Sequence, residues 1–394
     1  MVSTTVAGYP RTGPARELET LTGAYRAGRL GAEELLWMAR RMRAEIWREL
    51  ADAGLDTVPS NTFSFHDQVL DVAVMCDAVP DRFRAVARSF DPLAGPLDVY
   101  FAMARGAAGV APLETTTCSD PNYHHLVPEL GPSTRLMLVD DKPLREFREA
   151  AALGVVTRPV LVGPLTFLLL AKASAGAPDG FRPLDLLDGL VECYAELLGR
   201  LAAAGADWVQ LDEPALTGDL GQEELVALGR AYRWLGTLPA RPRLLVSTCF
   251  GEVGEALPVL RDAPVDGVGL DFVGGPGNTA ALARVGGLGD RTLFAGVVNG
   301  HDGRRADLPG ALSTCASLLG LVGDLVVTTC CSPLHVQLDH EGETSLDPPP
   351  VDRMAFARQK IDEVVLLGRA LRDGRENVAA EIDAAETRRL AVPG

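Results

Sequence analysis

Short apolar runs alternate with longer amphipathic stretches along most of this chain of 394 residues. Several of the apolar runs are continuous, which is typical of parallel strands that are buried on both faces. The stretches between them repeat apolar residues every three or four positions, as helices do. The pattern predicts strands at 57–59, 160–162, 208–211, 244–247, 267–271, 292–298 and 325–329, and helices that include 33–51, 184–204 and 254–261.

This alternation predicts an α/β protein with a single (β/α)8 barrel, the TIM-barrel fold. We expect residues 1–372 to form that barrel, with an N-terminal arm and extra helices in residues 1–50, before the first strand. A helix at 355–371 is expected to close it. Residues 373–394 are charged and rich in alanine, and they are predicted to form a C-terminal tail, either helical or frayed.

Composition excludes several classes of partner. The formal charge of −16 opposes binding to nucleic acid and to anionic lipid. The longest apolar run, 159–171, is shorter than the roughly 20 residues that span a bilayer. We therefore predict a cytoplasmic protein that binds neither nucleic acid nor membrane. Its seven cysteines are interpreted as reduced thiols or metal ligands.

Two adjacent carboxylates mark the end of the strand at 208–211. Asp212 and Glu213 follow this apolar segment directly, and Pro214 cannot continue a strand ladder. Ligands of α/β proteins bind at the carboxyl ends of parallel strands, so this pair is a candidate site. The alternative is that the pair caps the next helix.

Sequence motifs at the strand ends resemble the N-terminal barrel of cobalamin-independent methionine synthase, and the resemblance extends over nearly the whole chain. They are GYPRTGPAREL at 8–18, VPSNTFSFHD at 58–67, NYHHLVPE at 122–129, VGPLTF at 162–167, WVQLDEPA at 208–215 and CSPLHV at 331–336. That family is built from two face-to-face (β/α)8 barrels. Its C-terminal barrel binds zinc, homocysteine and methyl-tetrahydrofolate.

The resemblance also implies a zinc site. Cys249, Asp271 and Cys331 fall on three of the family's four ligand positions, whereas Ser247 stands where the family has histidine. Thiolate and carboxylate are good zinc ligands, and a catalytic zinc keeps one position open for a substrate. A thiol bound there would be deprotonated at neutral pH. His301 matches a histidine that serves proton transfer in the catalytic barrel.

The fourth zinc ligand and the direction of Cys330 also have to be predicted. Either His301 or His335 replaces the missing histidine ligand, or a site with three protein ligands suffices. Cys330 is expected to face away from Cys331, because adjacent strand residues point to opposite faces.

Substrate-binding residues are predicted from the same resemblance. Asp212 matches the aspartate that holds the homocysteine amino group, which a carboxylate attracts by charge. Glu19 replaces a lysine that is common in the family, and its negative charge disfavours a polyglutamate tail. The other predicted substrate-binding residues are Glu213 and Asp271, with Asn61 after a strand, Gly8 and Tyr9 at the pocket mouth, and Arg11 and Arg16 for a substrate carboxylate or a folate tail.

Three functions remain open at this point. The first is a zinc-dependent thiol alkyltransferase that transfers a methyl or related alkyl group to homocysteine or another small thiol, with methyl-tetrahydrofolate as the candidate methyl donor. The second is a zinc-free binding or scaffold barrel that partners a separately encoded catalytic barrel. The third is a folate-independent transferase that forms C–S bonds.

Overall fold

Eight parallel strands form the centre of the fold in the computed structural model, which describes residues 1–13, 15–86, 92–118, 120–334, 336, 338 and 354–390. Their order is β1-β12-β11-β10-β9-β8-β6-β2, and every neighbouring pair is parallel. The strands are β1 (Val2–Thr4), β2 (Val58–Ser60), β6 (Thr157–Val162), β8 (Trp208–Asp212), β9 (Arg243–Ser247), β10 (Gly267–Asp271), β11 (Gly289–Val298) and β12 (Val322–Thr329).

The two end strands of this order, β1 and β2, lie against each other. The backbone N–H groups of Asp56 and Thr57 donate to the carbonyl oxygen of Thr4 at 3.2 and 3.4 Å. The hydroxyl of Thr5 donates to the carbonyl oxygen of Thr57 at 2.8 Å. These contacts bring the ends of the sheet together, and the predicted barrel class is confirmed.

The first strand was not expected. Residues 1–50 were predicted to precede all strands, but Val2–Thr4 pairs with β12, with Val2 opposite Leu325. The prediction was wrong because three residues are too few to show an alternating pattern. The other seven predicted strands are confirmed, and their ends differ from the predicted ones by at most three residues.

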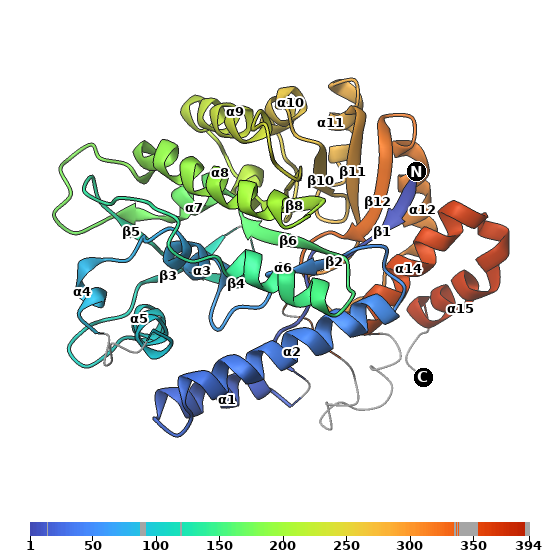
Figure 1. Ribbon diagram of the computed structural model, residues 1–394. Coiled ribbons are helices and arrows are strands. Elements are labelled where there is room, and N and C mark those ends of the chain that lie inside the picture. The colour runs from blue at the N-terminus through green and yellow to red at the C-terminus, as the bar shows by residue number, and fades with distance from the viewer. Residues whose placement is uncertain are drawn as a thin grey trace.

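Helices surround the sheet, and extra helices pack beside it (Figure 1). Those connecting or flanking the barrel strands are α2 (Ala32–Asp52), α3 (Gln68–Met75), α6 (Lys142–Ala152), α7 (Pro164–Leu170), α8 (Leu187–Ala203), α9 (Gln222–Gly236), α10 (Ala256–Asp262), α11 (Asn278–Arg284), α12 (Leu308–Leu318) and α14 (Ala357–Asp373). The four helix predictions correspond to α2, to α8 with the short turn before it, to α10, and to α14, which was expected at 355–371.

The remaining elements are additions to the barrel. Helices α1 (Glu17–Arg26), α4 (Asp81–Arg84) and α5 (Ala94–Arg105) precede a hairpin of β3 (Thr115–Cys118) and β4 (Asp120–Leu126), and β5 (Glu129–Leu130) pairs with β7 (Lys172–Ala173). Helix α15 (Ala379–Leu390) lies in the predicted tail. Ile382 and Ala385 of α15 are buried in the main core, while the proposed boundary at residue 372 stays a prediction.

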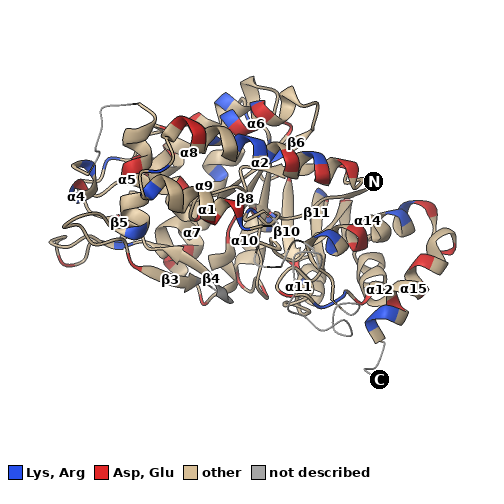
Figure 2. Cartoon of the chain, turned by 90° about the horizontal axis from the view of Figure 1, so that it is seen from below, with Lys and Arg blue, Asp and Glu red and all other residues tan. Residues whose placement is uncertain are grey.

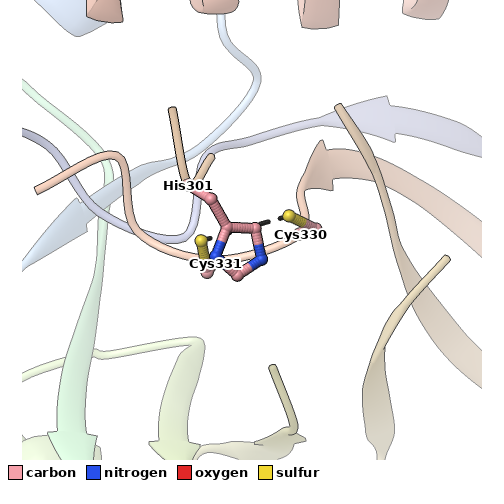
Figure 3. Close-up of side chains that lie close together, drawn as sticks. All are labelled: His301, Cys330 and Cys331. Carbon is pink, nitrogen blue, oxygen red and sulfur yellow. Dashed lines mark hydrogen bonds between the residues drawn. The ribbon is translucent and has the colours of Figure 1, made fainter. Parts of the chain in front are cut away.

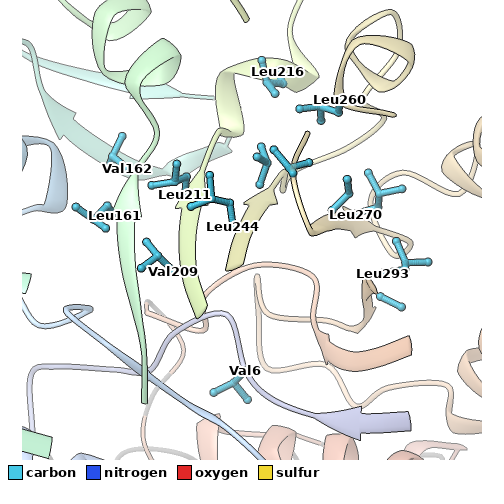
Figure 4. Packing of buried hydrophobic residues seen from close by; sticks show 14 of the residues in the cluster. Val6, Leu161, Val162, Val209, Leu211, Leu216, Leu244, Leu260, Leu270 and Leu293 are labelled. Carbon is cyan, nitrogen blue, oxygen red and sulfur yellow. The ribbon is translucent and has the colours of Figure 1, made fainter. Parts of the chain in front are cut away.

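The main hydrophobic core lies between the strands and the helices. Val209 and Leu211 of β8, Leu244 of β9 and Leu270 of β10 are at most 1% exposed (Figure 4). Burying an aliphatic side chain of this size contributes roughly 1.5 to 3 kcal/mol. The core therefore holds the strands rigidly and places the residues at their carboxyl ends.

Charge is mixed over the surface. Acidic and basic residues are interspersed along α2, α8 and α14 in Figure 2. Among the described residues, no helix is long and apolar enough to cross a bilayer.

Candidate functional site

Two neighbouring strands carry the chemical groups of the candidate site. Strands β11 and β12 are parallel, and Val298 at the end of one lies opposite Thr329 at the end of the other. The segments that follow, 299–301 and 330–331, therefore leave the barrel side by side. This places His301 next to Cys330 and Cys331.

These three side chains form a compact group. The possible ligand atoms of His301, Cys330 and Cys331 all lie within 4.8 Å of one another. The two sulfur atoms are 4.0 Å apart, and the imidazole ring lies close to both (Figure 3). Within the part of the chain that the structure describes, it is the one group of three or more such residues with this spacing. The two cysteines are 4% and 1% exposed, and His301 is partly exposed, so the sulfur atoms are shielded from water and the imidazole is less so.

The orientation of Cys330 differs from the prediction. Cys330 was expected to face away from Cys331, but its sulfur points to the same place. The prediction was wrong because the strict alternation of side chains ends with the strand at Thr329, and residues 330–331 lie in a bend.

The loop that carries His301 is held by short contacts. The backbone N–H of His301 donates to the side-chain oxygen of Asn299 at 2.8 Å. The amide nitrogen of Asn299 donates to Asp302 at 2.8 Å. The imidazole lies 5.2 Å from the ring of Phe250, centroid to centroid, with a tilt of 59°. Phe250 has a φ of 72°, a left-handed conformation that is unusual for a bulky residue.

The electrostatics of the cysteine pair favour a thiolate. The pKa of Cys330 is lowered to about 7, chiefly by its interaction with the Cys331 thiol. Burial opposes this shift, and His301 adds to it. The backbone N–H of Gly300 also donates to the Cys330 sulfur at 3.3 Å. A thiolate is the form of cysteine that binds metals.

Only one of the three predicted zinc ligands belongs to this group, namely Cys331. Asp271 is fully buried, and its carboxylate accepts hydrogen bonds from the backbone N–H groups of Gly251, Val273 and Gly274 at 2.8 to 3.1 Å. Cys249 is partly buried and lies outside the group. Metal binding by Cys249 and Asp271 stays a prediction. His335, the other candidate fourth ligand, lies outside the described residues.

Asp212 lies at the mouth of the barrel, at the end of a hydrogen-bonded chain. The buried Nε of Arg158 donates to the side-chain oxygen of Gln210 at 2.9 Å. The amide nitrogen of Gln210 donates to Asp212 at 2.6 Å. Burial raises the pKa of Asp212 to about 7, against the lowering effects of Gln210 and Arg158. Asp212 can therefore switch between neutral and charged forms near neutral pH.

Glu213 is directed into the protein. It is 0% exposed and accepts hydrogen bonds from the backbone N–H groups of Leu165 and Thr166 at the start of α7. The hydroxyl of Tyr232 also donates to it at 2.6 Å. These contacts give Glu213 a structural part in joining β8 to α7. The alternative that the pair caps the next helix is wrong for Glu213, because its side chain makes no cap for the turn at Pro214–Thr217 and bonds instead to the start of the preceding α7. Contact with substrate stays a prediction.

Gly8, Tyr9 and Asn61 support the loops around the mouth. A Cβ added to Gly8 would lie 2.2 Å from the hydroxyl oxygen of Ser332, so only glycine allows this approach. The buried Tyr9 donates its hydroxyl to Glu49 at 2.6 Å. Asn61 has a φ of 60°, and its amide donates to the carbonyl oxygen of Val160 at 2.8 Å. Substrate binding by these three residues stays a prediction.

The two predicted anion-binding arginines already have partners. Arg16 forms an ion pair with Glu19 at 2.9 Å, and both side chains are more than half exposed. The guanidinium of Arg11 donates to the backbone carbonyl of His66. The charge of Arg16 is thus balanced within the chain by the residue that departs from the family's lysine.

Sequence reasoning missed two buried basic residues near the site. Arg158 lies inside the barrel, and Lys360 of α14 is 0% exposed and donates to the carbonyl oxygen of Arg304 at 3.0 Å. The sequence feature that could have identified them is a single basic residue among apolar ones, Arg158 in strand β6 and Lys360 on the buried face of helix α14. Such residues are almost never fully buried unless they are paired.

The comparisons with known proteins agree with the fold and with the motifs. The family model described as "Cobalamin-independent synthase, N-terminal domain" matches residues 3–322. The chain belongs to the cobalamin-independent methionine synthase family.

Relatives of this family barrel are named as methyltransferases. The 5-methyltetrahydropteroyltriglutamate–homocysteine methyltransferase of Streptomyces coelicolor is 51% identical over 381 residues, which are 96% of this chain and 49% of the relative. The protein of the same name from Rhodococcus jostii is 49% identical over 378 residues, which are 96% and 48% of the two chains. This chain therefore spans about half the length of these relatives.

Solved structures show the same fold at low sequence identity. A B12-independent methionine synthase from Shewanella sp. W3-18-1, in complex with selenomethionine, superposes with a TM-score of 0.61 at 16% identity, covering 97% of this chain and 99% of the other. A putative vitamin-B12 independent methionine synthase from Listeria monocytogenes gives the same TM-score at 14% identity, covering 94% and 99%.

Proposed function

We propose that this barrel takes part in methyl transfer to the sulfur of homocysteine, with a methyltetrahydropteroyl polyglutamate as the donor. The names of relatives near 50% identity, which are 5-methyltetrahydropteroyltriglutamate–homocysteine methyltransferases, support both the acceptor and the donor. The observation that carries the proposal is the convergence of thiol and imidazole groups at the end of a barrel of this family. We place the reaction in the cytoplasm, where reducing conditions keep thiols free.

The proposed reaction needs a thiolate as nucleophile. Zinc would supply it, because a zinc-bound thiol loses its proton near neutral pH. The predicted ligands Cys249, Asp271 and Cys331 end or follow β9, β10 and β12, so they belong to one edge of the barrel. Cys331, which also belongs to the compact group, supports zinc at this edge.

Asp212 is proposed to hold the amino group of the substrate. Its carboxylate lies at the carboxyl end of β8, and when ionised it attracts an ammonium group. The hydrogen bonds from Arg158 to Gln210 and from Gln210 to Asp212 hold this carboxylate in position. His301 is the proposed acceptor of the thiol proton in this scheme, since an imidazole titrates near neutral pH.

A second candidate is favoured by the Arg16–Glu19 ion pair. Because Glu19 neutralises Arg16, this surface offers less attraction to a polyglutamate tail. The alternative is a folate-independent alkyl transfer to a small thiol. The comparisons do not support a separately encoded catalytic barrel, since the relatives match 96% of this chain within single proteins.

The test is an assay of methionine formation by the purified chain with zinc, homocysteine and methyltetrahydropteroyl triglutamate. We expect turnover that is lost in Cys331→Ser and kept in Cys315→Ser, a buried cysteine of α12 outside the group. Absence of turnover with this donor, together with turnover with an alkyl donor that has no glutamate tail, would favour the second candidate. Equal turnover in both variants would refute a role for Cys331.

A further inference from the structure

The group at the ends of β11 and β12 has a composition that suits one metal. It combines two cysteine sulfurs and one imidazole, all from the carboxyl side of neighbouring strands. We propose that His301, Cys330 and Cys331 bind one zinc ion as three ligands, with the fourth position open to a small thiol. The ligand set differs from the one that the family resemblance implied, and it shares only Cys331 with it.

The sulfur positions fit tetrahedral zinc. With Zn–S bonds of about 2.3 Å, two sulfurs on a tetrahedral ion lie about 3.8 Å apart. The sulfurs of Cys330 and Cys331 are 4.0 Å apart. An imidazole nitrogen at about 2.0 to 2.1 Å from the ion would lie about 3.6 Å from each sulfur. The three ligand atoms already lie within 4.8 Å of one another, so rotation of the His301 side chain can close the remaining gap.

The surroundings hold the ligands in place. The backbone N–H of Gly300 points to the Cys330 sulfur, as outer contacts to metal-bound thiolates do. The His301 loop is tied to α14 and its start, because Ala355 donates to the carbonyl oxygen of Gly303 at 2.7 Å and Lys360 donates to that of Arg304 at 3.0 Å. A site on supported loops loses little entropy when it binds a metal.

The charges around the group have to be balanced when a metal binds. Two metal-bound thiolates need positive charge, and a zinc ion between them would supply it directly. The buried Lys360 also lies near both cysteines, so its ammonium group, if charged, adds positive charge beside the site. Asp271 lies near His301 and Cys330, and burial raises its pKa. Its three backbone hydrogen bonds hold it in place as a neighbour of the ion.

This inference changes the part assigned to His301. An imidazole nitrogen that binds zinc cannot accept the thiol proton, so the two roles exclude each other. The ligand set stands independently of the proposed methyl transfer, because metal binding is measured without turnover. The thiol in the fourth position rests on the proposed function.

The experiment is a cobalt titration of the metal-free full chain under reducing conditions. We expect one Co²⁺ per chain, with thiolate-to-metal charge-transfer bands and the d–d bands of a tetrahedral site, and displacement of Co²⁺ by zinc. Cys330→Ser and His301→Gln should weaken binding at least about tenfold. Cys249→Ser distinguishes this ligand set from the one with Cys249 and Asp271, and it keeps the wild-type spectrum only if His301, Cys330 and Cys331 are the ligands. Cys315→Ser, a buried cysteine outside both sets, is the matched control. Thermal unfolding of each metal-free variant checks that it folds.

The results separate the possibilities. A wild-type spectrum in Cys330→Ser, together with its loss in Cys249→Ser, would overturn the proposed ligands in favour of the earlier set. Absence of a tetrahedral spectrum in the folded wild-type chain would overturn the site itself. Homocysteine should shift the charge-transfer bands if its sulfur enters the fourth position. An unchanged spectrum at saturating homocysteine would refute the thiol position while leaving the three protein ligands intact.

Discussion

The sulfur atoms of Cys330 and Cys331 lie 4.0 Å apart, although the two residues are adjacent in the chain. In a strand, such neighbours would point to opposite faces. The bend after β12 turns both side chains toward the loop that follows β11. The distance between these two strand ends is therefore set by the barrel, and it determines the chemistry that this edge can perform.

Gly300 should be intolerant of a side chain. A Cβ at this position would lie 2.4 Å from the carbonyl oxygen of Cys331 and 3.0 Å from its sulfur. We expect Gly300→Ala to lower the free energy of unfolding by about 1 to 3 kcal/mol, because the loop and the cysteine bend must move apart. Urea unfolding measures this change.

Gly320→Ala is the control, since a Cβ there would have no atom within 4 Å. It should alter the free energy of unfolding by no more than about 0.5 kcal/mol. Equal effects of the two variants would show that the close approach to Cys331 is unimportant.

The ionisation of Asp212 should make stability depend on pH. Burial raises the pKa of Asp212 to about 7, whereas an unfolded aspartate has a pKa of about 3.9. The folded chain therefore keeps a proton that the unfolded chain loses, and the stability from this group, present below about pH 4, is lost as the pH rises to 7. Asp212→Asn removes this loss. The free energy of unfolding of the variant, relative to wild type, should increase by about 1 to 4 kcal/mol between pH 4 and 8.

Denaturant unfolding at several pH values tests the effect, with Asp219→Asn as a charge-matched variant on the exposed surface. A difference between Asp212→Asn and wild type that is the same at pH 4 and pH 8 contradicts the raised pKa.

Reversing the charge of Glu19 should strengthen binding of polyglutamate. Glu19→Lys removes the ion pair with Arg16 and leaves two cations on an exposed surface. Each exposed charge contact contributes up to about 1 kcal/mol, so we expect the Kd for methyltetrahydropteroyl triglutamate to fall roughly fivefold to tenfold. The Kd for the monoglutamate should change less, and calorimetry can compare the two.

Glu45→Lys makes the same charge change on an exposed residue of α2 that pairs with Arg41. It corrects for the general effect of net charge. If both variants improve binding equally, the surface around Arg16 has no specific part in holding the tail.

Removing the charge of Glu213 should destabilise the junction of β8 and α7. Its carboxylate accepts hydrogen bonds from two backbone N–H groups and from Tyr232 while fully buried. In Glu213→Gln an amide N–H₂ faces one of these donors, which leaves a buried polar group unpaired. We expect a loss of about 2 to 4 kcal/mol in the free energy of unfolding, measured in urea.

Glu223→Gln on the exposed first turn of α9 is the control, and its effect should stay below about 1 kcal/mol. A loss in Glu213→Gln no larger than that of the control would mean that the junction does not depend on the carboxylate.

Much of the fold could be predicted because most strands and helices have a recognisable local pattern of apolar and polar residues. Continuous apolar runs identified seven of the eight barrel strands, and the amphipathic repeats identified α2, α8, α10 and α14. Strand β1 was missed, since three residues carry too little pattern and it pairs with β12, a strand far away in the sequence, with Val2 opposite Leu325. Strand pairing over such a separation is a property of the closed barrel.

Some features of the candidate site could likewise be predicted from the sequence, and others could not. Position at a strand end selected Asp212 from the sequence, because ligand-binding groups collect where parallel strands end. His301 and Cys331 were selected by the resemblance of their segments to the family. Only the tertiary structure decided that Cys330 turns toward Cys331, that His301 joins them, and that Glu213 points into the core. The direction of a side chain beyond a strand end depends on the bend of the backbone and on its packed neighbours, and neither is encoded in a repeating pattern of adjacent residues.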